Sequence, residues 1–405
     1  MGLGAIMLLL VATLLAGLLL QPLGERHHIP LAAILVACGF VSTQLLQLLG
    51  MQSEINHEIF HELIVYVFLP ILVFAAAFRI DAELFHRNLW LILFLAIPGL
   101  LISLGIVAVL VYYGIGHPAG FPWIAAFITA AVIAATDASP ITSHFPRLQI
   151  PKRLRVLLEG EDLFNDATAI VVFGICVYIA LHPGEDIGSA DVLLRFCVVF
   201  FGGALIGLLT GIGFLLLSRL FDDHLHQALV TLIAAYTAYL LAYDVLHVSG
   251  IMAVLVIGLI MGRVIHNDFQ DERGTFVDGF WDFSAFAVEA AMFALTGMVL
   301  SLGMFEQRWL AILIGIVALL IGRAAVVTGT AAVLTRSPHA IAPAAQGILL
   351  GASLRGAVVL ALALALPTSL PYWWTIQSIA FGVVVFSLFV QEPLTLRLLH
   401  TRKSD

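Results

Sequence analysis

The sequence predicts an all-α integral membrane protein with about thirteen transmembrane helices. Of its 405 residues, 61% are hydrophobic and only 11% are charged, whereas soluble domains carry about 25% charged residues. The mean hydropathy is +1.08, and long apolar runs follow one another with only short polar breaks between them. These observations exclude a soluble enzyme, and a formal net charge of −8 argues against a nucleic-acid-binding protein.

Each predicted span is an apolar run of about 20 residues, the length that crosses a bilayer. The approximate cores are residues 3–20, 30–50, 60–78, 89–114, 121–144, 155–181, 192–218, 225–246, 249–265, 280–303, 309–334, 341–366 and 373–396. The first run has no basic segment before it, so we interpret it as a span and not as a signal peptide. Because the tail at 401–405 is short, we expect residues 1–405 to form a single integral-membrane domain without a soluble regulatory domain.

The distribution of basic residues supports this count and predicts an orientation. With the N-terminus outside and the C-terminus cytoplasmic, 14 of the 18 Lys and Arg residues fall on the cytoplasmic side, as the positive-inside rule requires. They are Arg26, Arg79, Arg87, Arg147, Lys152, Arg153, Arg155, Arg219, Arg263, Arg273, Arg336, Arg397, Arg402 and Lys403. Arg195 and Arg308 lie opposite, while Arg323 and Arg355 fall inside spans, where a charge needs a partner or a water-filled cavity.

The fifth predicted span carries polar residues at membrane mid-depth. Thr136, Asp137 and Ser139 precede Pro140, which has no N–H and cannot bond the carbonyl of Thr136. Irregular backbone at that depth is tolerated only inside protein or along a cavity, and broken helices are where transporters hold ions. A simple proline kink with self-bonded hydroxyls would leave Asp137 unexplained.

The sixth predicted span opens with several carboxylates. Asp162 and Asp166 share one helix face, and Glu161 and Asn165 share another. In a low-dielectric environment these acids cannot all ionise unless they bind a proton, a cation or an arginine. Oxygen ligands of this kind suit a small hard cation.

A second interrupted helix is predicted around Arg355, which stands between Gly351 and Gly356. Interruptions in two halves of such a chain indicate an inverted repeat with the site between them. Arg355 needs a carboxylate, and we assign Glu161 to it.

These motifs resemble those of the NhaP-type sodium/proton antiporters and the animal sodium/proton exchangers. The shared features are the Thr136-Asp137 pair on an unwound helix, the Gly-Glu-x-x-x-Asn-Asp run at 160–166, and Leu-Arg-Gly-Ala-Val at 354–358. The resemblance covers essentially the whole chain. It implies an antiporter fold with inverted repeats and two crossed, interrupted helices.

The resemblance also implies the roles of individual residues. Asp166 would be the carboxylate where sodium and protons compete, with Asp137 and the Thr136 carbonyl helping to bind the ion. Glu161 would pair with Arg355, and Asn165 would brace the broken helices. Ser139 is a further candidate for core support.

The resemblance further implies a membrane-embedded homodimer that works as an elevator with electroneutral one-for-one exchange, and it implies no cofactor beyond the transported Na⁺ (or Li⁺ or K⁺) and H⁺. Such a protein is a transporter and not an enzyme, and it would lie in lipid. The short tail at 401–405 favours a prokaryotic inner membrane. The chain departs from the family pattern at three positions: Asp162 replaces a serine, Ala75 replaces a glutamate, and Glu289 replaces an asparagine. These changes bear on ion choice and stoichiometry.

Other interpretations of the sequence remain open. The run from His57 to His61 matches His-Glu-x-x-His, in which His57, Glu58 and His61 would form a zinc protease site, although no third ligand stands out. A K⁺/H⁺ antiporter or a cation channel on a related fold would carry similar polar residues. Arg323 would pair with Glu289 or reach a cavity. The three cysteines, Cys38, Cys176 and Cys197, are interpreted as apolar core residues without disulfides.

Overall fold

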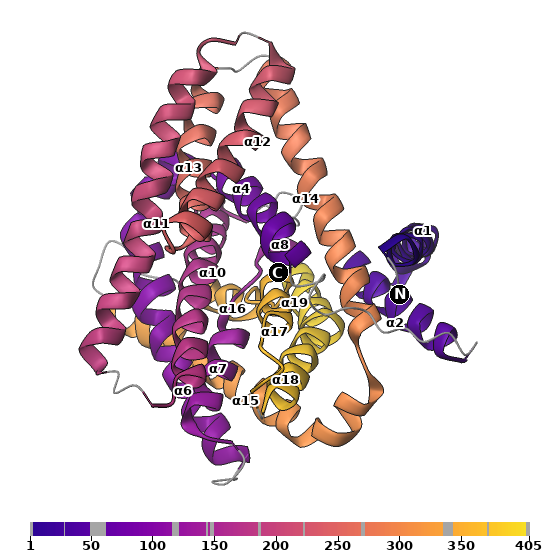
Figure 1. The fold of residues 1–405 in the computed structure, drawn as a ribbon. Helices are drawn as coiled ribbons and strands as arrows, with labels where there is room; N and C mark the ends of the chain where they lie inside the picture. The colour runs from indigo at the N-terminus through magenta and orange to yellow at the C-terminus, as the bar shows by residue number, and fades with distance from the viewer. Residues whose placement is uncertain are drawn as a thin grey trace. The chain divides into compact units, whose positions relative to one another are not determined.

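The computed structural model describes residues 3–27, 29–48, 62–115, 121–142, 145, 150–184, 188–221, 223–268, 272–334, 343–370 and 372–401. Within these ranges the chain is helical and contains no β-strand (Figure 1). The only extended pairing there is a single antiparallel bridge between Asp137 and Leu354. The predicted all-α class is therefore confirmed.

The helices form two compact units, and η1, η2 and α14 each run across a boundary between them. The first unit comprises Met1–Ile64, Gly99–Ile150 and Glu289–Asp405, and the second comprises Val65–Pro98 and Pro151–Val288. Helices of the first unit are α1 (Leu3–His27), α2 (Leu31–Leu48), α6 (Leu100–Ile115), α7 (Trp123–Ala134), α8 (Ser139–Thr142), α15 (Leu302–Val333), α16 (Pro343–Gly351), α17 (Ala357–Leu364), α18 (Trp373–Phe386), η4 (Ser387–Gln391) and α19 (Glu392–Thr401). Helices of the second unit are η1 (Ile64–Phe68), α4 (Leu69–Arg79), α5 (Ala82–Phe94), η2 (Leu95–Gly99), α10 (Lys152–Leu181), α11 (Ser189–Ser218), α12 (His224–Leu240), η3 (Leu241–Val245), α13 (Gly250–Asp268) and most of α14 (Glu272–Val299).

The first unit is built around α15, which packs against α6 and α18, while α6 also packs against α7. Close backbone approach joins α2 to the end of α14. A Cβ atom added at Gly39 would collide with the carbonyl oxygen of Ala294, and one at Gly297 would collide with that of Val36. Small residues therefore set the distance between these two helices, as is usual in membrane proteins.

In the second unit, α13 packs against α4, α11 and α12 (Figure 1). Gly207 on α11 lies so close to α13 that a Cβ atom would collide with the carbonyl oxygen of Ala253. The core includes Trp281 of α14, whose ring centroid lies 4.3 Å from the ring centroid of Phe74. Its Nε1 donates a hydrogen bond of 3.0 Å to the hydroxyl of Thr231, so the buried indole is both packed and satisfied.

Short π-helical segments occur next to prolines. Pro98 lies inside η2, while Pro70 and Pro393 each follow a π-helix, η1 and η4 respectively. A proline removes one N–H donor from the ladder of helical hydrogen bonds, and local π adjustments help to satisfy the freed backbone groups in membrane helices. Three of the four π-segments thus have a covalent cause in the sequence.

Eight helices of the described chain are long and apolar enough to cross a membrane, and four shorter apolar helices accompany them. Large apolar side chains on α11, such as Leu193, Phe201 and Leu216, are more than half exposed. A helix that exposes such side chains along its length requires an apolar surrounding. The protein is therefore a multi-pass membrane protein. The count of thirteen spans, the inverted repeat and the single domain remain predictions.

Candidate functional site

Two interrupted helices meet in the first unit, as the sequence predicts. One interruption lies between the end of α7 at Ala134 and the start of α8 at Ser139, and the other lies between α16 and α17, from Gly351 to Ala357. The backbone N–H of Asp137 donates a hydrogen bond of 3.0 Å to the carbonyl of Leu354. We call this junction, residues 135–138 and 352–356, the crossing.

The first interruption has a local cause in Pro140, the second residue of α8. Because it lacks an N–H, the helical bond to Thr136 cannot form. Within the break, the Asp137 carboxylate accepts a hydrogen bond of 3.1 Å from the backbone N–H of Ser139. Thr136 is buried, Asp137 is half-buried and Ser139 is exposed.

Arg355 anchors the second interruption through backbone carbonyls. Its side chain is only 3% exposed, and its Nε donates a hydrogen bond of 2.6 Å to the carbonyl of Ile133 in the last turn of α7. The Nη1 atom donates to the carbonyls of Ser353 and Leu354 at 3.1 and 3.0 Å. A helix C-terminus carries partial negative charge, so the guanidinium lies where a cation is favoured.

Asp137 lies in the complementary position, beside the start of α17. A Cβ atom added at Gly356, the residue before α17, would collide with the Asp137 carboxylate. A helix N-terminus carries partial positive charge, which favours an anion there. Arg355, from the second interruption, is thus stabilised by the helix end at the first interruption. Asp137, from the first interruption, is stabilised by the helix start at the second interruption.

Arg323 supports the crossing from α15. It is buried, and its Nη2 and Nε donate to the carbonyl of Leu349 in the last turn of α16 at 3.1 and 3.4 Å. The hydroxyl of Ser353 donates to the same oxygen at 2.9 Å. Arg323 is therefore a second buried guanidinium at a helix end, here the C-terminal end of α16. Its pairing with Glu289, which is half-buried on α14, remains a prediction.

A further set of polar residues near the end of the chain holds the crossing, and the sequence analysis did not select them. The amide of Gln391 donates to the carbonyls of Ser353 and Gly351 at 3.1 and 3.3 Å. The hydroxyl of Thr395 donates to the carbonyl of Gly351 at 3.1 Å. The signal was present, because Gln391 and Glu392 precede Pro393 within a predicted span, just as Asp137 precedes Pro140.

The remaining predicted site residues lie on α10, in the second unit. Glu161 and Asn165 are buried, while Asp162 and Asp166 are half-buried. All four are on one uninterrupted helix, so the i, i+4 pairs share faces as expected. Because the crossing belongs to the first unit, the pairing of Glu161 with Arg355 and the joint ion site of Asp166 with Asp137 and Thr136 remain predictions.

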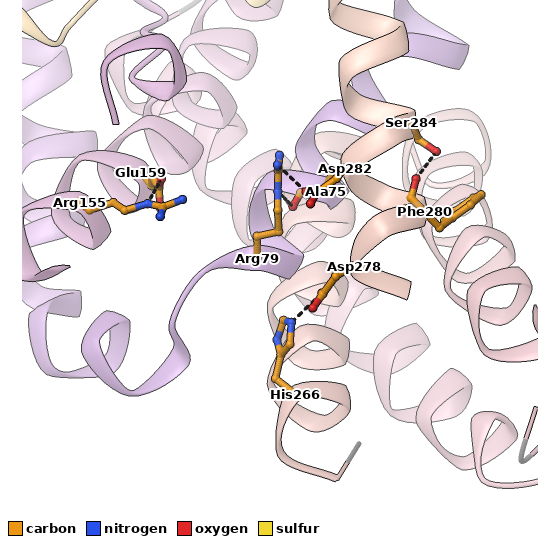
Figure 2. A network of polar contacts seen from close by, with 9 residues as sticks. All are labelled: Ala75, Arg79, Arg155, Glu159, His266, Asp278, Phe280, Asp282 and Ser284. Atoms are coloured by element: carbon orange, nitrogen blue, oxygen red, sulfur yellow. Dashed lines mark hydrogen bonds and ion pairs between the residues drawn. The ribbon is translucent and has the colours of Figure 1, made fainter. Parts of the chain in front are cut away.

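A separate set of polar contacts lies in the second unit (Figure 2). Arg79 and Asp282 are exposed there, and His266 and Asp278 are half-buried. Arg79 at the end of α4 donates a hydrogen bond of 2.9 Å to the carboxylate of Asp282 and one of 3.0 Å to the carbonyl of Ala75. His266 lies 2.8 Å from a carboxylate oxygen of Asp278. We call Arg79 and Asp282 the exposed charge group.

Nothing in the described part of the chain resembles a structural metal site, since no group of three or more His, Cys, Asp or Glu residues there could hold a metal ion. The predicted zinc motif of His57, Glu58 and His61 lies outside the described residues. All three cysteines are free; Cys176 is buried as a core residue would be, whereas Cys38 and Cys197 are half-buried.

Comparison with known proteins gives a consistent family. Residues 7–400 match the family described as "Sodium/hydrogen exchanger, transmembrane". The chain is 34% identical over 352 residues to the Na⁺/H⁺ antiporter NhaP of Pseudomonas aeruginosa, covering 84% of this chain and 81% of that protein. It is 33% identical over 341 residues to the low-affinity Na⁺/H⁺ antiporter NhaS1 of Synechocystis, covering 82% of this chain but spanning only 63% of that relative.

The fold is also similar to a solved structure. The sodium proton antiporter MjNhaP1 from Methanocaldococcus jannaschii at pH 8 superposes with a TM-score of 0.79 at 23% identity, covering 98% of this chain and 100% of that one. This likeness establishes the antiporter fold that the motifs predicted. By the match along nearly its whole length, the chain belongs to the transmembrane sodium/hydrogen exchanger family.

Proposed function

We propose that this protein is a secondary active transporter that exchanges Na⁺ for H⁺ across a membrane. The observation that carries the proposal is the crossing, where two interrupted helices bring a buried arginine and an aspartate to opposite helix ends. Ion transporters hold their substrates at broken helices of this kind. Relatives that are named Na⁺/H⁺ antiporters support the same activity.

The chemistry of the proposed exchange is a competition at Asp166. A carboxylate in a low-dielectric site holds either a proton or a cation, because the empty charged form is costly. Asp137, Asp162 and the Thr136 carbonyl would supply further oxygen ligands, the type that a small hard cation prefers. If only the occupied site crosses the membrane barrier, each crossing carries one ligand, and electroneutral one-for-one exchange follows.

The core support comes from neighbouring polar groups. In this scheme Glu161 pairs with Arg355, Asn165 braces the interrupted helices, and Ser139 and Glu289 hold the surrounding polar structure. The protein would work as a homodimer in lipid, with elevator-type movement of the ion site. Its N-terminus would face the outside of a prokaryotic inner membrane, because the basic loops then lie in the cytoplasm.

The test is exchange in proteoliposomes that hold a preset pH gradient, with Na⁺, Li⁺ or K⁺ added outside and the voltage either free or clamped. We expect a cation-driven pH change that is indifferent to voltage and is lost in Asp166→Asn. The matched control is Glu83→Gln, which alters an acid with 75% side-chain exposure in the same unit and should leave exchange unchanged.

Each result bears on a different part of the proposal. Normal exchange by a folded Asp166→Asn variant would exclude competition at that residue. A response to K⁺ alone would favour the K⁺/H⁺ alternative. Voltage-dependent exchange would overturn the one-for-one stoichiometry.

A further inference from the structure

Two buried side chains near the end of the chain bond the second interruption, and the proposed exchange gives neither of them a role. Gln391 is the last residue of η4, and Thr395 lies one turn later on α19. Both are buried. The Gln391 amide donates to the carbonyl of Ser353 at 3.1 Å. It also donates to the carbonyl of Gly351 at 3.3 Å, and the Thr395 hydroxyl donates to that same oxygen at 3.1 Å.

The orientation of these two donors is fixed by their surroundings. The hydroxyl of Ser387, which is buried four residues earlier in η4, donates to the amide oxygen of Gln391 at 3.4 Å. The NH₂ end of the amide must therefore face the carbonyls of the second interruption. A Cβ atom added at Gly351 would collide with the Thr395 side chain, so this side chain fits tightly against the end of α16. Both donors thus belong to the packed interior.

The two donors complete the hydrogen bonding of the second interruption. A carbonyl oxygen has two lone pairs, and four carbonyls there each accept at least two hydrogen bonds. That of Leu349 is bonded by Arg323 and Ser353, that of Gly351 by Gln391 and Thr395, that of Ser353 by Gln391 and Arg355, and that of Leu354 by Arg355 and the N–H of Asp137. These oxygens have no lone pair left for a cation. The second interruption is therefore a fully bonded support for the backbone of Asp137.

We propose that Gln391 and Thr395 are positioning residues that set the affinity for Na⁺ by holding this support in place. The carbonyl of Leu354, which accepts the bond from the Asp137 N–H, directly follows the residue whose carbonyl Gln391 holds. Without the amide donor the segment is free to shift, and the acceptor that fixes Asp137 shifts with it. Groups that orient ion ligands from behind commonly change ion affinity by 10- to 100-fold when they are lost. This inference rests on the proposed function and deepens it.

The binding test measures the rise in melting temperature that Na⁺ causes in detergent, because a ligand stabilises the folded state that binds it. Gln391→Met keeps an unbranched side chain of similar length but removes the donor, so the Na⁺ concentration for half-maximal stabilisation should rise about tenfold. Thr395→Val removes one hydrogen bond and should raise it about threefold. Thr395→Ser restores the hydroxyl and should stay within about twofold of the unchanged protein. An unaltered Na⁺ midpoint in Gln391→Met would overturn the proposal.

Gln377 provides the matched control for a purely structural loss. It is a buried glutamine on α18 in the same unit, and its amide donates 3.0 Å to the carbonyl of Ala363, in the last turn of α17 and away from the crossing. Gln377→Met therefore loses a buried hydrogen bond of the same kind. It should lower the melting temperature measured without Na⁺ but leave the Na⁺ midpoint unchanged. An equal shift of the midpoint in both methionine variants would reduce Gln391 to a structural role and overturn the proposal.

Hydrogen exchange at the backbone of Asp137 tests the positioning without Na⁺ or transport. In Gln391→Met the N–H of Asp137 should exchange about tenfold faster than in the unchanged protein, because its acceptor is held less firmly. In Gln377→Met it should exchange at the unchanged rate. Equal rates in the unchanged protein and in Gln391→Met would contradict the proposal. If the unchanged protein moves no protons with any cation in proteoliposomes, the proposed function fails, whereas this exchange rate still decides whether Gln391 positions Asp137.

Discussion

Two groups of charged residues in this protein show how differently a charge is held at a buried and at an exposed position. At the crossing, Arg355 is 3% exposed and donates to three backbone carbonyls. In the exposed charge group, the Arg79 side chain is 42% exposed and pairs with the carboxylate of Asp282 at 2.9 Å (Figure 2). The guanidinium of Arg355 binds backbone carbonyls inside the protein, whereas that of Arg79 binds a carboxylate within reach of solvent.

The difference explains where the two interrupted helices obtain their stability. Breaking a helix inside a membrane leaves carbonyls without partners, and each such group costs about 1–3 kcal/mol when buried. Arg355 and Arg323 satisfy these carbonyls at the ends of α7 and α16. An exposed ion pair such as Arg79–Asp282 contributes only about 0–1 kcal/mol. The crossing should therefore depend on its charges far more than the exposed charge group does.

The largest effect is expected from Arg355→Ala. Removing the guanidinium leaves the carbonyls of Ile133, Ser353 and Leu354 without this donor, so we expect a loss of roughly 3 kcal/mol or more of stability and no exchange. Arg355→Lys keeps the charge but offers a single ammonium in place of a planar fork, so it should recover only part of the loss. Thermal unfolding in detergent and exchange in proteoliposomes measure both. An alanine variant with an unchanged melting temperature would contradict the comparison.

A smaller loss of stability is expected from Gly356→Ala. The added Cβ atom would collide with the Asp137 carboxylate, which must then move away from the start of α17. We expect a loss of about 1–3 kcal/mol together with a clear loss of Na⁺-driven exchange. The control is Gly329→Ala on α15, where a Cβ atom meets open space, and which should be neutral or stabilising by up to about 1 kcal/mol. Equal behaviour of the two variants would exclude a tight fit at Gly356.

The smallest effect is expected from the Arg79–Asp282 pair. A double-mutant cycle with Arg79→Ala and Asp282→Ala should give a coupling energy below about 1 kcal/mol that decreases further at high salt. Arg79→Ala alone should cost more than Asp282→Ala, because Arg79 also bonds the carbonyl of Ala75. A coupling of several kcal/mol would remove the distinction between the two groups of charges.

Much of the crossing was predictable from local sequence. Pro140 beside Asp137, and glycines on both sides of Arg355, correctly indicated two interrupted helices, because these residues weaken a helix whatever surrounds them. The bond from Arg355 to Ile133, which lies 222 residues away, could not be predicted. The sequence around a buried arginine does not show which distant helix end will offer it carbonyls, because that depends on how the helices pack.

Glu392 illustrates a different failure of prediction. The segment Gln391-Glu392-Pro393 has the same pattern of polar residues before a proline as the segment at 137–140. The sequence alone does not show whether this acid, near the end of the last predicted span, is buried or solvated. Only the packing of α19 against α8 and α16 shows that the carboxyl group is buried at the crossing.

The most direct measurement compares one carboxylate from each group of charges in the same assay. Na⁺-driven proton movement would be recorded in proteoliposomes with Asp137→Asn and, separately, with Asp282→Asn. We predict that the folded Asp137→Asn variant loses exchange, whereas Asp282→Asn retains it at the level of the unchanged protein. Normal exchange by a folded Asp137→Asn variant would contradict the assignment of the crossing to ion transport.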